Sequence, residues 1–341
     1  MQSPNIKIGE IIIGKSSRPK IIAEAGVSHF GSMSKLQDLV DFAARARADF
    51  FKIQHFDASK LINASDSEWL ERLRPKEVSN DFIKEAKQYC DEKNIEFLCT
   101  GHDEESLEFL FKENLVRAVK IGSGERGNNR LFDLAIASGL PLIISLGMYE
   151  QAHVNRLCNY LEKKNKKDVI LLHCVTSYPT EPKDANICYV KTLSESCNFL
   201  AGYSDHTVGI TFSLAAVALG ARLIEKHIAL DFNVPNAQDW KVSSDEAELK
   251  QLCTQVDNLF QGMTSTAEKA TNGPEIKSKI WALKSPYYSC NLAPGDKVRE
   301  EHIVIQRPFT GVDPSDAEQK IGKPLTKDVK AGAPLSDEDF Y

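Results

Sequence analysis

The 341-residue sequence lacks any apolar run that approaches the roughly 20 residues required by a membrane-spanning helix. Its first residues, MQSPNIKIGEIIIGK, include an apolar stretch, but Glu10 interrupts it and it is too short for the hydrophobic region of a signal peptide. We therefore expect no association with membranes and a cytoplasmic location.

Excess positive charge and closely paired cysteines are also missing. A formal net charge of −6 provides no general attraction for nucleic acid or anionic lipid, so any anion must be bound by a local cluster of basic side chains. We expect no nucleic-acid partner. The eight cysteines include no C-x-x-C pair, and most lie within apolar segments. This distribution predicts reduced thiols that pack as small core residues, and it argues against a zinc–thiolate site.

No dinucleotide-binding G-x-G-x-x-G sequence follows the first apolar run, which argues against a Rossmann-type sheet. What the sequence does contain is an alternation of short β-rich runs with longer stretches of helical periodicity. The β-rich runs span residues 20–26, 49–54, 95–100, 117–123, 141–147, 169–174, 199–204 and 221–227. Eight β/α units over about 250 residues are typical of the parallel (β/α)8 barrel. The predicted fold class is therefore α/β, a TIM barrel.

Capping residues and apolar spacing indicate where the helices of this barrel begin. Ser34 and Gln37 have the spacing of a capping box before the first helix, and Asp103 is placed to cap the helix after the third strand. Residues 209–220 are apolar on nearly all sides, which predicts a buried helix. Residues 6–14 form either a hairpin that plugs the bottom of the barrel or a loose extension.

The composition changes after the last barrel helix. We assign residues 1–265 to the barrel domain. Residues 266–280 are polar and have no apolar periodicity, so they are expected to form a linker. Residues 281–341 contain short β-rich runs, Pro-Gly and Gly-Lys-Pro turns, and few apolar residues. They predict a small second domain that packs on a barrel or on a partner subunit.

Polar side chains recur at the carboxyl ends of the predicted strands, where the active sites of TIM barrels lie. His206 follows the seventh strand and His227 ends the eighth, so the two imidazoles should share one mouth. Two imidazoles with oxygen partners suit a divalent transition metal that keeps positions open for substrate. Asp205 is placed to orient His206 through a hydrogen bond. The histidines interpreted as ordinary hydrogen-bonded residues are His29, His55, His102, His153 and His302.

Two lysines point to an anionic ligand. Lys52 and Lys120 would be costly to bury in a barrel unless each met an anion. They form either a structural pair with a glutamate or a cradle for phosphate or carboxylate. The hydroxyl groups that could complete this cradle belong to Thr100, Ser123, Ser145 and Ser204. A metal, a cradle and nearby carboxylates predict carbonyl chemistry, with Glu24 either as the general base or as a structural partner of a lysine.

Seven segments occur in the order IIAEAG, FKIQ, KIGSGE, LIISLGM, LLHCVTSYPT, GYSDHTVGI and VALGARLIEKH. Together they resemble the sialic acid (nonulosonate) synthases, a family that includes N-acetylneuraminate, legionaminate and pseudaminate synthases and spore-coat polysaccharide relatives. The segments VIQRPFTGVDP and IGKPLTKDVKAG near the C-terminus resemble the antifreeze-like (SAF) domain of that family.

The resemblance implies that phosphoenolpyruvate condenses with an open-chain N-acylated hexosamine, typically a mannosamine, to give a nine-carbon 2-keto acid and phosphate. It implies a divalent metal on His206 and His227, with manganese expected first and magnesium or cobalt as alternatives. It assigns phosphoenolpyruvate to Lys52, Thr100, Lys120, Ser123, Ser145, Thr176 and Ser204. It assigns the sugar to Gln54, Glu125, Tyr178, Asp239 and Arg307, the last of which would reach across a domain-swapped homodimer.

Three segments depart from the family pattern: SHFG at 28–31, CTGH at 99–102 and PNAQDWK at 235–241. The third makes the assignment of Asp239 depend on a one-residue insertion. All three belong to the mouth, so they bear on the acceptor sugar. Retention of SGE and LLHC favours a neuraminate or legionaminate synthase over a pseudaminate synthase. The alternatives are a spore-coat relative, a metal-dependent barrel aldolase or hydrolase, and a sugar-binding protein without activity.

Overall fold

The computed structural model describes residues 5–234, 239–263 and 273–340. The chain divides into two compact units, Met1–Thr264 and Ser265–Tyr341. Each unit has its own apolar core and is described by itself. None of the helices in the described ranges is long and apolar enough to cross a membrane.

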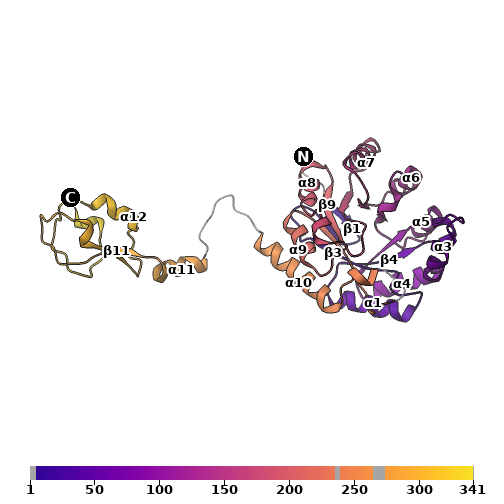
Figure 1. Ribbon diagram of the computed structural model, residues 1–341, viewed down its shortest axis with the longest axis horizontal. Coiled ribbons are helices and arrows are strands. Elements are labelled where there is room, and N and C mark those ends of the chain that lie inside the picture. Colours follow the sequence, from indigo (N-terminus) through magenta and orange to yellow (C-terminus); the bar gives the residue numbers. More distant parts are fainter. Residues whose placement is uncertain (1–4, 235–238, 264–272, 341) are drawn as a thin grey trace. The chain divides into compact units, whose positions relative to one another are not determined.

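The first unit is a (β/α)8 barrel, as the alternation of the sequence predicts (Figure 1). Its parallel strands are β3 (Lys20–Gly26), β4 (Phe50–His55), β5 (Glu96–Gly101), β6 (Val119–Ile121), β7 (Leu142–Ser145), β8 (Val169–His173), β9 (Leu200–Asp205) and β10 (Leu223–His227). Around the sheet the order is β5, β4, β3, β10, β9, β8, β7 and β6. Strands β5 and β6 lie next to each other, which closes the ring.

A helix follows each strand on the outside of the barrel (Figure 1). These helices are α1 (Met33–Arg45), α4 (Asn80–Glu92), α5 (Glu104–Lys112), α6 (Asn129–Ala137), α7 (Gln151–Lys163), α8 (Tyr189–Ser196), α9 (Thr211–Ala218) and α10 (Glu246–Gly262). Two short helices, α2 (Ala58–Leu61) and α3 (Ser67–Leu73), are inserted between β4 and α4. The insertion was not evident from apolar spacing, because α3 buries none of its residues.

The helix termini test the capping predictions. Asp103 caps α5 by accepting a hydrogen bond from the Ser106 backbone, as expected. The capping box at Ser34 and Gln37 is wrong, because α1 starts two residues earlier than it predicts and Ser32 is its N-cap. The helix α9 is apolar but only partly buried. Its first and last residues are exposed because only one side faces the strands.

Residues near the N-terminus form the hairpin β1 (Ile6–Ile8) and β2 (Ile11–Ile13) and not a loose extension. Ile6, Ile8 and Ile13 are at most 1% exposed and belong to one apolar cluster with residues from the barrel strands. The other members of this cluster are Ile22, Phe50, Leu98, Ala118, Ile143, Ile170, Leu172, Leu200 and Leu223. Ala118 directly precedes β6, and the others except Leu172 lie in the first half of their strands, so the hairpin plugs the bottom of the barrel.

All eight cysteines are free thiols, as the sequence predicts. Cys90, Cys99, Cys174 and Cys253 are buried, and they serve as small core residues.

The second unit contains α11 (Gly273–Ala282), β11 (Ser285–Tyr288), β12 (Ile303–Gln306) and α12 (Pro314–Ala317). Strands β11 and β12 pair antiparallel around a small core that includes Tyr288, Val298 and Leu325. Part of the predicted linker, residues 273–280, is helical. This helix buries none of its residues, so it leaves no apolar periodicity of the usual strength in the sequence. Residues 264–272 of that linker lie outside the described residues.

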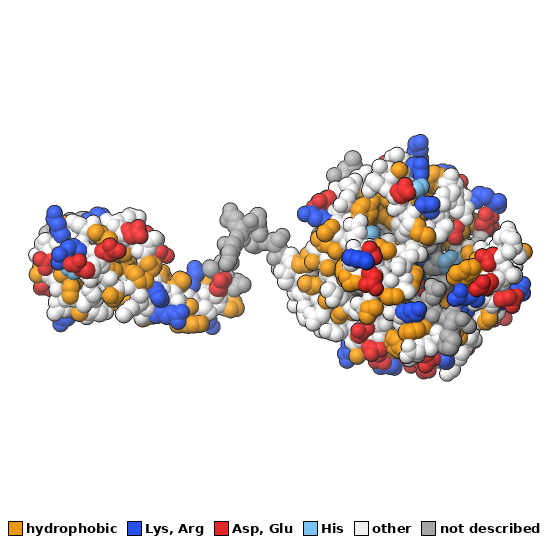
Figure 2. Space-filling model, viewed as in Figure 1, with side chains coloured by type: hydrophobic (Ala, Val, Ile, Leu, Met, Phe, Trp, Pro, Cys, Tyr) orange, Lys and Arg blue, Asp and Glu red, His pale blue; other side chains and the backbone are white. Residues whose placement is uncertain are grey.

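Several apolar side chains of the second unit are exposed. Ile276, Ile280 and Trp281 of α11 are 56%, 63% and 63% exposed. Figure 2 shows hydrophobic side chains along the α11 side of this unit, whereas both signs of charge are interspersed over the visible face of the barrel. Contiguous exposed apolar surface of this kind is typical of an interaction site.

Candidate functional site

Three buried charged groups meet inside the carboxyl end of the barrel, which we call the mouth. Lys52 on β4 and Lys120 on β6 are each 3% exposed. The Nζ atom of Lys52 lies 2.9 Å from Glu225 Oε2, and that of Lys120 lies 3.8 Å from Glu225 Oε1. Glu225, on β10, therefore holds two ammonium groups together. Glu225 was not among the site residues predicted from the sequence, although it shares the inward parity of His227 two residues later.

Hydroxyl groups complete this cluster. Lys120 donates a hydrogen bond to Ser145 Oγ at 2.8 Å. Ser204 donates to Glu225 Oε1 at 2.9 Å, and Lys52 reaches Thr100 Oγ1 at 3.5 Å. We call Lys52, Lys120, Thr100, Ser145 and Ser204 the anion cradle; Ser123, which was predicted with them, contacts Thr176 instead. All five residues were predicted from the sequence to share one pocket, and the structure brings them together.

A second carboxylate, Glu24 on β3, borders the cradle. It is 1% exposed, and its Oε2 atom lies 3.2 Å from Lys52 Nζ. Gln54 donates to Glu24 Oε1 at 3.3 Å. Gly26 has a φ of +54°, and a side chain at this position would lie 3.1 Å from Asp239 Oδ2 and 3.4 Å from Glu24 Oε1. Asp239 thus lies beside Glu24 and Gln54, as its assignment to the sugar requires.

Burial and neighbouring charges push the two carboxylates in opposite directions. Burial raises the pKa of Glu24 to about 7, although Lys52 opposes this shift. For Glu225 burial acts in the same direction, but Lys120 and Lys52 together outweigh it and hold its pKa below the usual range. Burial lowers the pKa of Lys120, whereas both glutamates hold the pKa of Lys52 above its usual value. Glu24 is therefore the carboxylate that can exchange a proton near neutral pH.

The two predicted metal ligands lie beside each other. The imidazole centroids of His206 and His227 are 5.5 Å apart, and the Tyr178 ring lies 4.2 Å from the first and 5.8 Å from the second. His206 Nδ1 lies 2.7 Å from the Val175 carbonyl and therefore carries the proton that it donates to that oxygen. Its Nε2 atom, 3.1 Å from the Tyr178 hydroxyl, is left with a lone pair.

These imidazoles have the chemistry of metal ligands. Burial lowers the pKa of His206 to about 4 and that of His227 to about 3, so both rings are neutral at physiological pH. His227 Nδ1 is buried and has no hydrogen-bond partner among the described residues. Within the described ranges, no group of three or more His, Cys, Asp or Glu side chains is arranged to hold a metal. A metal here would have two protein ligands and open positions for substrate.

Asp205 does not orient His206, so that prediction is wrong. Its Oδ1 atom accepts hydrogen bonds from the backbone and hydroxyl of Thr207, and Oδ2 accepts one from Ser213. Lys226 lies 3.6 Å from it. The carboxylate points away from the imidazole because adjacent strand residues face opposite sides of the sheet. The Val175 carbonyl orients His206 instead.

The loops after β6, β7 and β8 bring another hydroxyl pair together. Ser123 Oγ lies 3.4 Å from Thr176 Oγ1. A side chain on Gly147 would lie 2.3 Å from Thr176 Oγ1 and 3.0 Å from Ser123 Oγ, so the close approach requires glycine here. Glu125, predicted to contact the sugar, accepts a hydrogen bond from Asn128 at 2.7 Å. No described contact joins Glu125 to the cradle.

Two more predictions have different outcomes. Arg307 belongs to the second unit, where its guanidinium lies 5.9 Å from the centroid of the Trp281 ring, so its reach to a sugar stays a prediction.

His102 was interpreted as an ordinary histidine, but it lies 3.5 Å from where a side chain on Gly122 would begin. Burial lowers its pKa to about 4, and Lys52 and Lys120 add to that shift. His102 therefore faces the cradle.

Comparisons with known proteins agree with this architecture. Residues 39–268, more than half of the chain, match the NeuB family. The chain is 34% identical to the N,N'-diacetyllegionaminic acid synthase of Campylobacter jejuni, covering 91% of this chain and 96% of that protein. It is 36% identical to the N-acetylneuraminate-9-phosphate synthase of Drosophila melanogaster, covering 74% and 71%.

A solved structure gives the same result. The N-acetylneuraminic acid synthetase of Leptospira borgpetersenii, in complex with citrate, superposes with a TM-score of 0.75 at 33% identity, covering 81% of this chain and 95% of that one. The barrel, the arrangement of its mouth and these similarities lead to one conclusion: the chain belongs to the NeuB family, whose named members here are synthases.

Proposed function

We propose that this chain condenses phosphoenolpyruvate with an open-chain N-acylated hexosamine of the mannosamine type. The products are a nine-carbon 2-keto sugar acid of the sialic or legionaminic type and inorganic phosphate. The observation that carries the proposal is the convergence of two buried ammonium groups and two neutral imidazoles in one mouth. The first pair suits an anionic reactant, and the second suits a carbonyl reactant bound through a metal.

Phosphoenolpyruvate carries a phosphate and a carboxylate, and the cradle offers a cation for each. Lys52 and Lys120 both contact Glu225, so their ammonium groups are held close together before substrate arrives. The hydroxyls of Ser145 and Thr100 lie within reach of these ammonium groups and would fix the orientation of the anion. Holding the enol in one orientation lowers the entropic part of the barrier to carbon–carbon bond formation.

The aldehyde of the sugar would meet His206 and His227. These neutral imidazoles fit a divalent ion, and we propose manganese, with magnesium or cobalt as alternatives. Such an ion supplies Lewis acidity, which polarises the aldehyde oxygen. Tyr178 lies against both rings and would border the sugar, and Gln54 and Asp239 lie on the Glu24 side of the mouth.

Glu24 is our candidate for the base that activates water toward C2. A carboxylate with a pKa of about 7 is well matched to proton transfer near neutral pH. Its ion pair with Lys52 also fits the alternative, a structural partner of the cradle. Exchange of Glu24 for glutamine distinguishes the two roles, because only the base must accept a proton.

We further propose that the second unit is an antifreeze-like (SAF) domain and that the protein is a domain-swapped homodimer. The exposed apolar residues Ile276, Ile280 and Trp281 support a partner surface. Arg307 lies over Trp281 on this surface, and in a swapped dimer it would approach the acyl group of a sugar bound to the other copy.

The test is a phosphate-release assay with phosphoenolpyruvate, manganese and a panel of N-acylated hexosamines, with mass spectrometry of the product. We expect one phosphate per nine-carbon acid formed. A pseudaminate-type or spore-coat relative would prefer another acceptor in the panel. Turnover of pyruvate in place of phosphoenolpyruvate would indicate an aldolase. Sugar binding without phosphate release would indicate a homologue without activity.

A further inference from the structure

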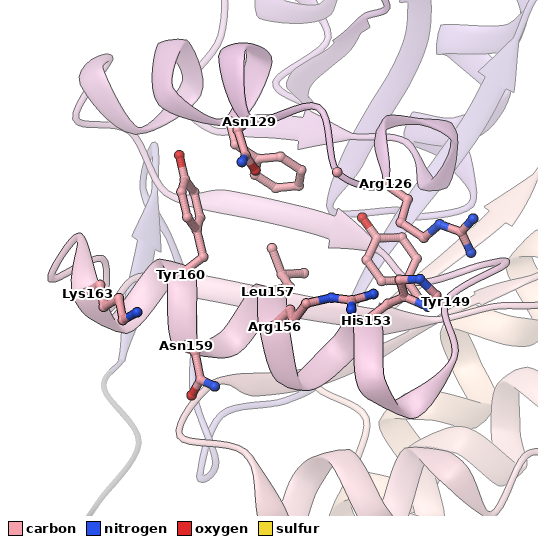
Figure 3. A pocket seen from close by; sticks show the side chains of 11 residues that line it. Arg126, Asn129, Tyr149, His153, Arg156, Leu157, Asn159, Tyr160 and Lys163 are labelled. Atoms are coloured by element: carbon pink, nitrogen blue, oxygen red, sulfur yellow. The ribbon is translucent and has the colours of Figure 1, made fainter.

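A cavity of about 610 Å³ lies between helices α6 and α7, on the outer side of the barrel (Figure 3). Eleven residues line it, from the two helices and from the loops that precede them. We call it the cation groove, because Arg126, Arg156 and Lys163 line it. None of the cradle residues or the paired imidazoles is among its lining residues, so the cavity has no role in the proposed reaction.

The charges of the groove are unbalanced. Its lining residues include three permanent cations and no aspartate or glutamate. Among the residues that the structure describes, none of the three cations has a carboxylate partner. The neighbouring Lys164, the C-cap residue of α7, pairs with Asp133 at 2.6 Å. In a chain with a net charge of −6, such a local concentration of positive charge indicates an anion site.

Donors gather at one end of the groove. Figure 3 shows Arg156 extending along α7 toward Tyr149 and His153, with Arg126 on the other side of the Tyr149 ring. Arg126 donates to the Met148 carbonyl, which uses one of its five N–H groups. The Tyr149 hydroxyl is buried, so the two guanidinium groups are the donors that face the cavity at this end. Two guanidinium forks match the oxygens of a phosphate group.

Apolar side chains form the middle of the groove. Phe132 and Tyr160 meet edge to face, with centroids 6.4 Å apart, and Leu157 lies beside them in the lining. The Tyr160 hydroxyl donates to Asp133 at 2.5 Å, which fixes the ring. Phe132 is 2% exposed, so the Tyr160 ring forms the accessible part of this wall, and an aromatic face suits a planar ring. The volume lies in the range of about 300–1,000 Å³ that is typical of pockets for small molecules.

We propose that the cation groove binds a small phosphate monoester that carries a planar ring, of the size of a nucleoside monophosphate. The phosphate lies between the Arg126 and Arg156 guanidinium groups, and the ring lies against the Tyr160 ring. The bound molecule also touches the loops after β6 and β7, which carry Ser123 and Gly147 into the mouth.

Isothermal titration of the full-length protein with 5′-AMP tests the proposal. We expect binding that phosphoenolpyruvate does not displace and that adenosine, without the phosphate, does not reproduce. R156Q should weaken it about tenfold or more, because a charge-assisted contact to phosphate is lost. Y149F should leave the affinity unchanged, because the hydroxyl that it removes is buried and the ring is kept. The matched control K167Q removes one positive charge from an exposed lysine outside the groove and should leave the affinity unchanged.

The proposal is overturned if 5′-AMP does not bind, if adenosine binds as tightly, or if R156Q and K167Q bind it equally. Displacement by phosphoenolpyruvate also overturns it, because the 5′-AMP would then occupy the anion cradle. Circular dichroism of R156Q checks its fold. The titration measures binding and needs no turnover. Its result therefore tests the cation groove independently of the proposed condensation reaction.

Discussion

Exchange of Glu225 for glutamine removes one negative charge from the mouth while keeping the shape of the side chain. The carboxylate lies 2.9 Å from the Lys52 ammonium and 3.8 Å from that of Lys120. At an effective dielectric constant of about 20 these separations correspond to about 6 and about 4 kcal/mol of attraction. The desolvation of Glu225 cancels part of this, and loss of one partner from a buried pair typically costs about 3–5 kcal/mol. We expect E225Q to lower the free energy of unfolding by about 3–5 kcal/mol.

The same substitution should strengthen the binding of an anion in the mouth. In E225Q, Lys52 keeps its ion pair with Glu24, whereas Lys120 loses the one carboxylate that the described residues place within 4 Å of it, so phosphoenolpyruvate replaces a missing counter-charge. We expect it to raise the stability of E225Q more than that of the wild type at equal concentration. Tenfold tighter binding would add about 1.4 kcal/mol.

Urea unfolding with and without phosphoenolpyruvate measures both effects. The matched control is D231N, which also converts an acid to its amide, in an exposed pair with Lys35 at 2.6 Å. An exposed pair contributes about 0–1 kcal/mol, so D231N should change little. If E225Q loses no more stability than D231N, or gains no more from phosphoenolpyruvate than the wild type, the reasoning about the cradle is refuted.

Three further substitutions test other parts of the molecule. H227N should remove the rise in melting temperature caused by manganese and abolish turnover, because one of two ligands is lost; an unchanged manganese effect would contradict the metal assignment. E24Q should lower kcat by about 10²–10⁴ and remove the increase of rate with pH through about 7, since only the deprotonated carboxylate acts as a base; an unchanged pH profile would leave Glu24 a structural partner. I8A should lower the free energy of unfolding by about 2–5 kcal/mol and I12A by far less, because Ile8 is fully buried and Ile12 is 50% exposed; equal losses would mean that the hairpin does not plug the barrel.

The barrel could be predicted because its periodicity is strong. Each strand is a buried apolar run followed by a polar residue, and the (β/α)8 fold requires those polar ends to meet. That requirement predicts that Lys52 and Lys120 meet, and the structure agrees. The Asp205 prediction failed because it used proximity in sequence, whereas strand geometry sends neighbours to opposite faces.

Glu225 and His102 were missed for a different reason. Glu225 lies between apolar residues and a lysine in LIEKH, where it resembles one member of a surface pair. Only the closed barrel places it between two lysines from strands more than 100 residues away in sequence. His102 follows a strand end like several other histidines, and its position by Gly122 depends on the path of two loops.

The β1–β2 hairpin has a kinetic consequence. With the bottom of the barrel plugged by Ile6, Ile8 and Ile13, both reactants must enter, and the product must leave, through one opening. The strand register places Lys52 level with Glu24, and Glu24 level with His227, so the cradle and the imidazoles share one level of the barrel. In the proposed reaction, product that stays in the mouth would therefore block both reactants, and it should compete with each of them.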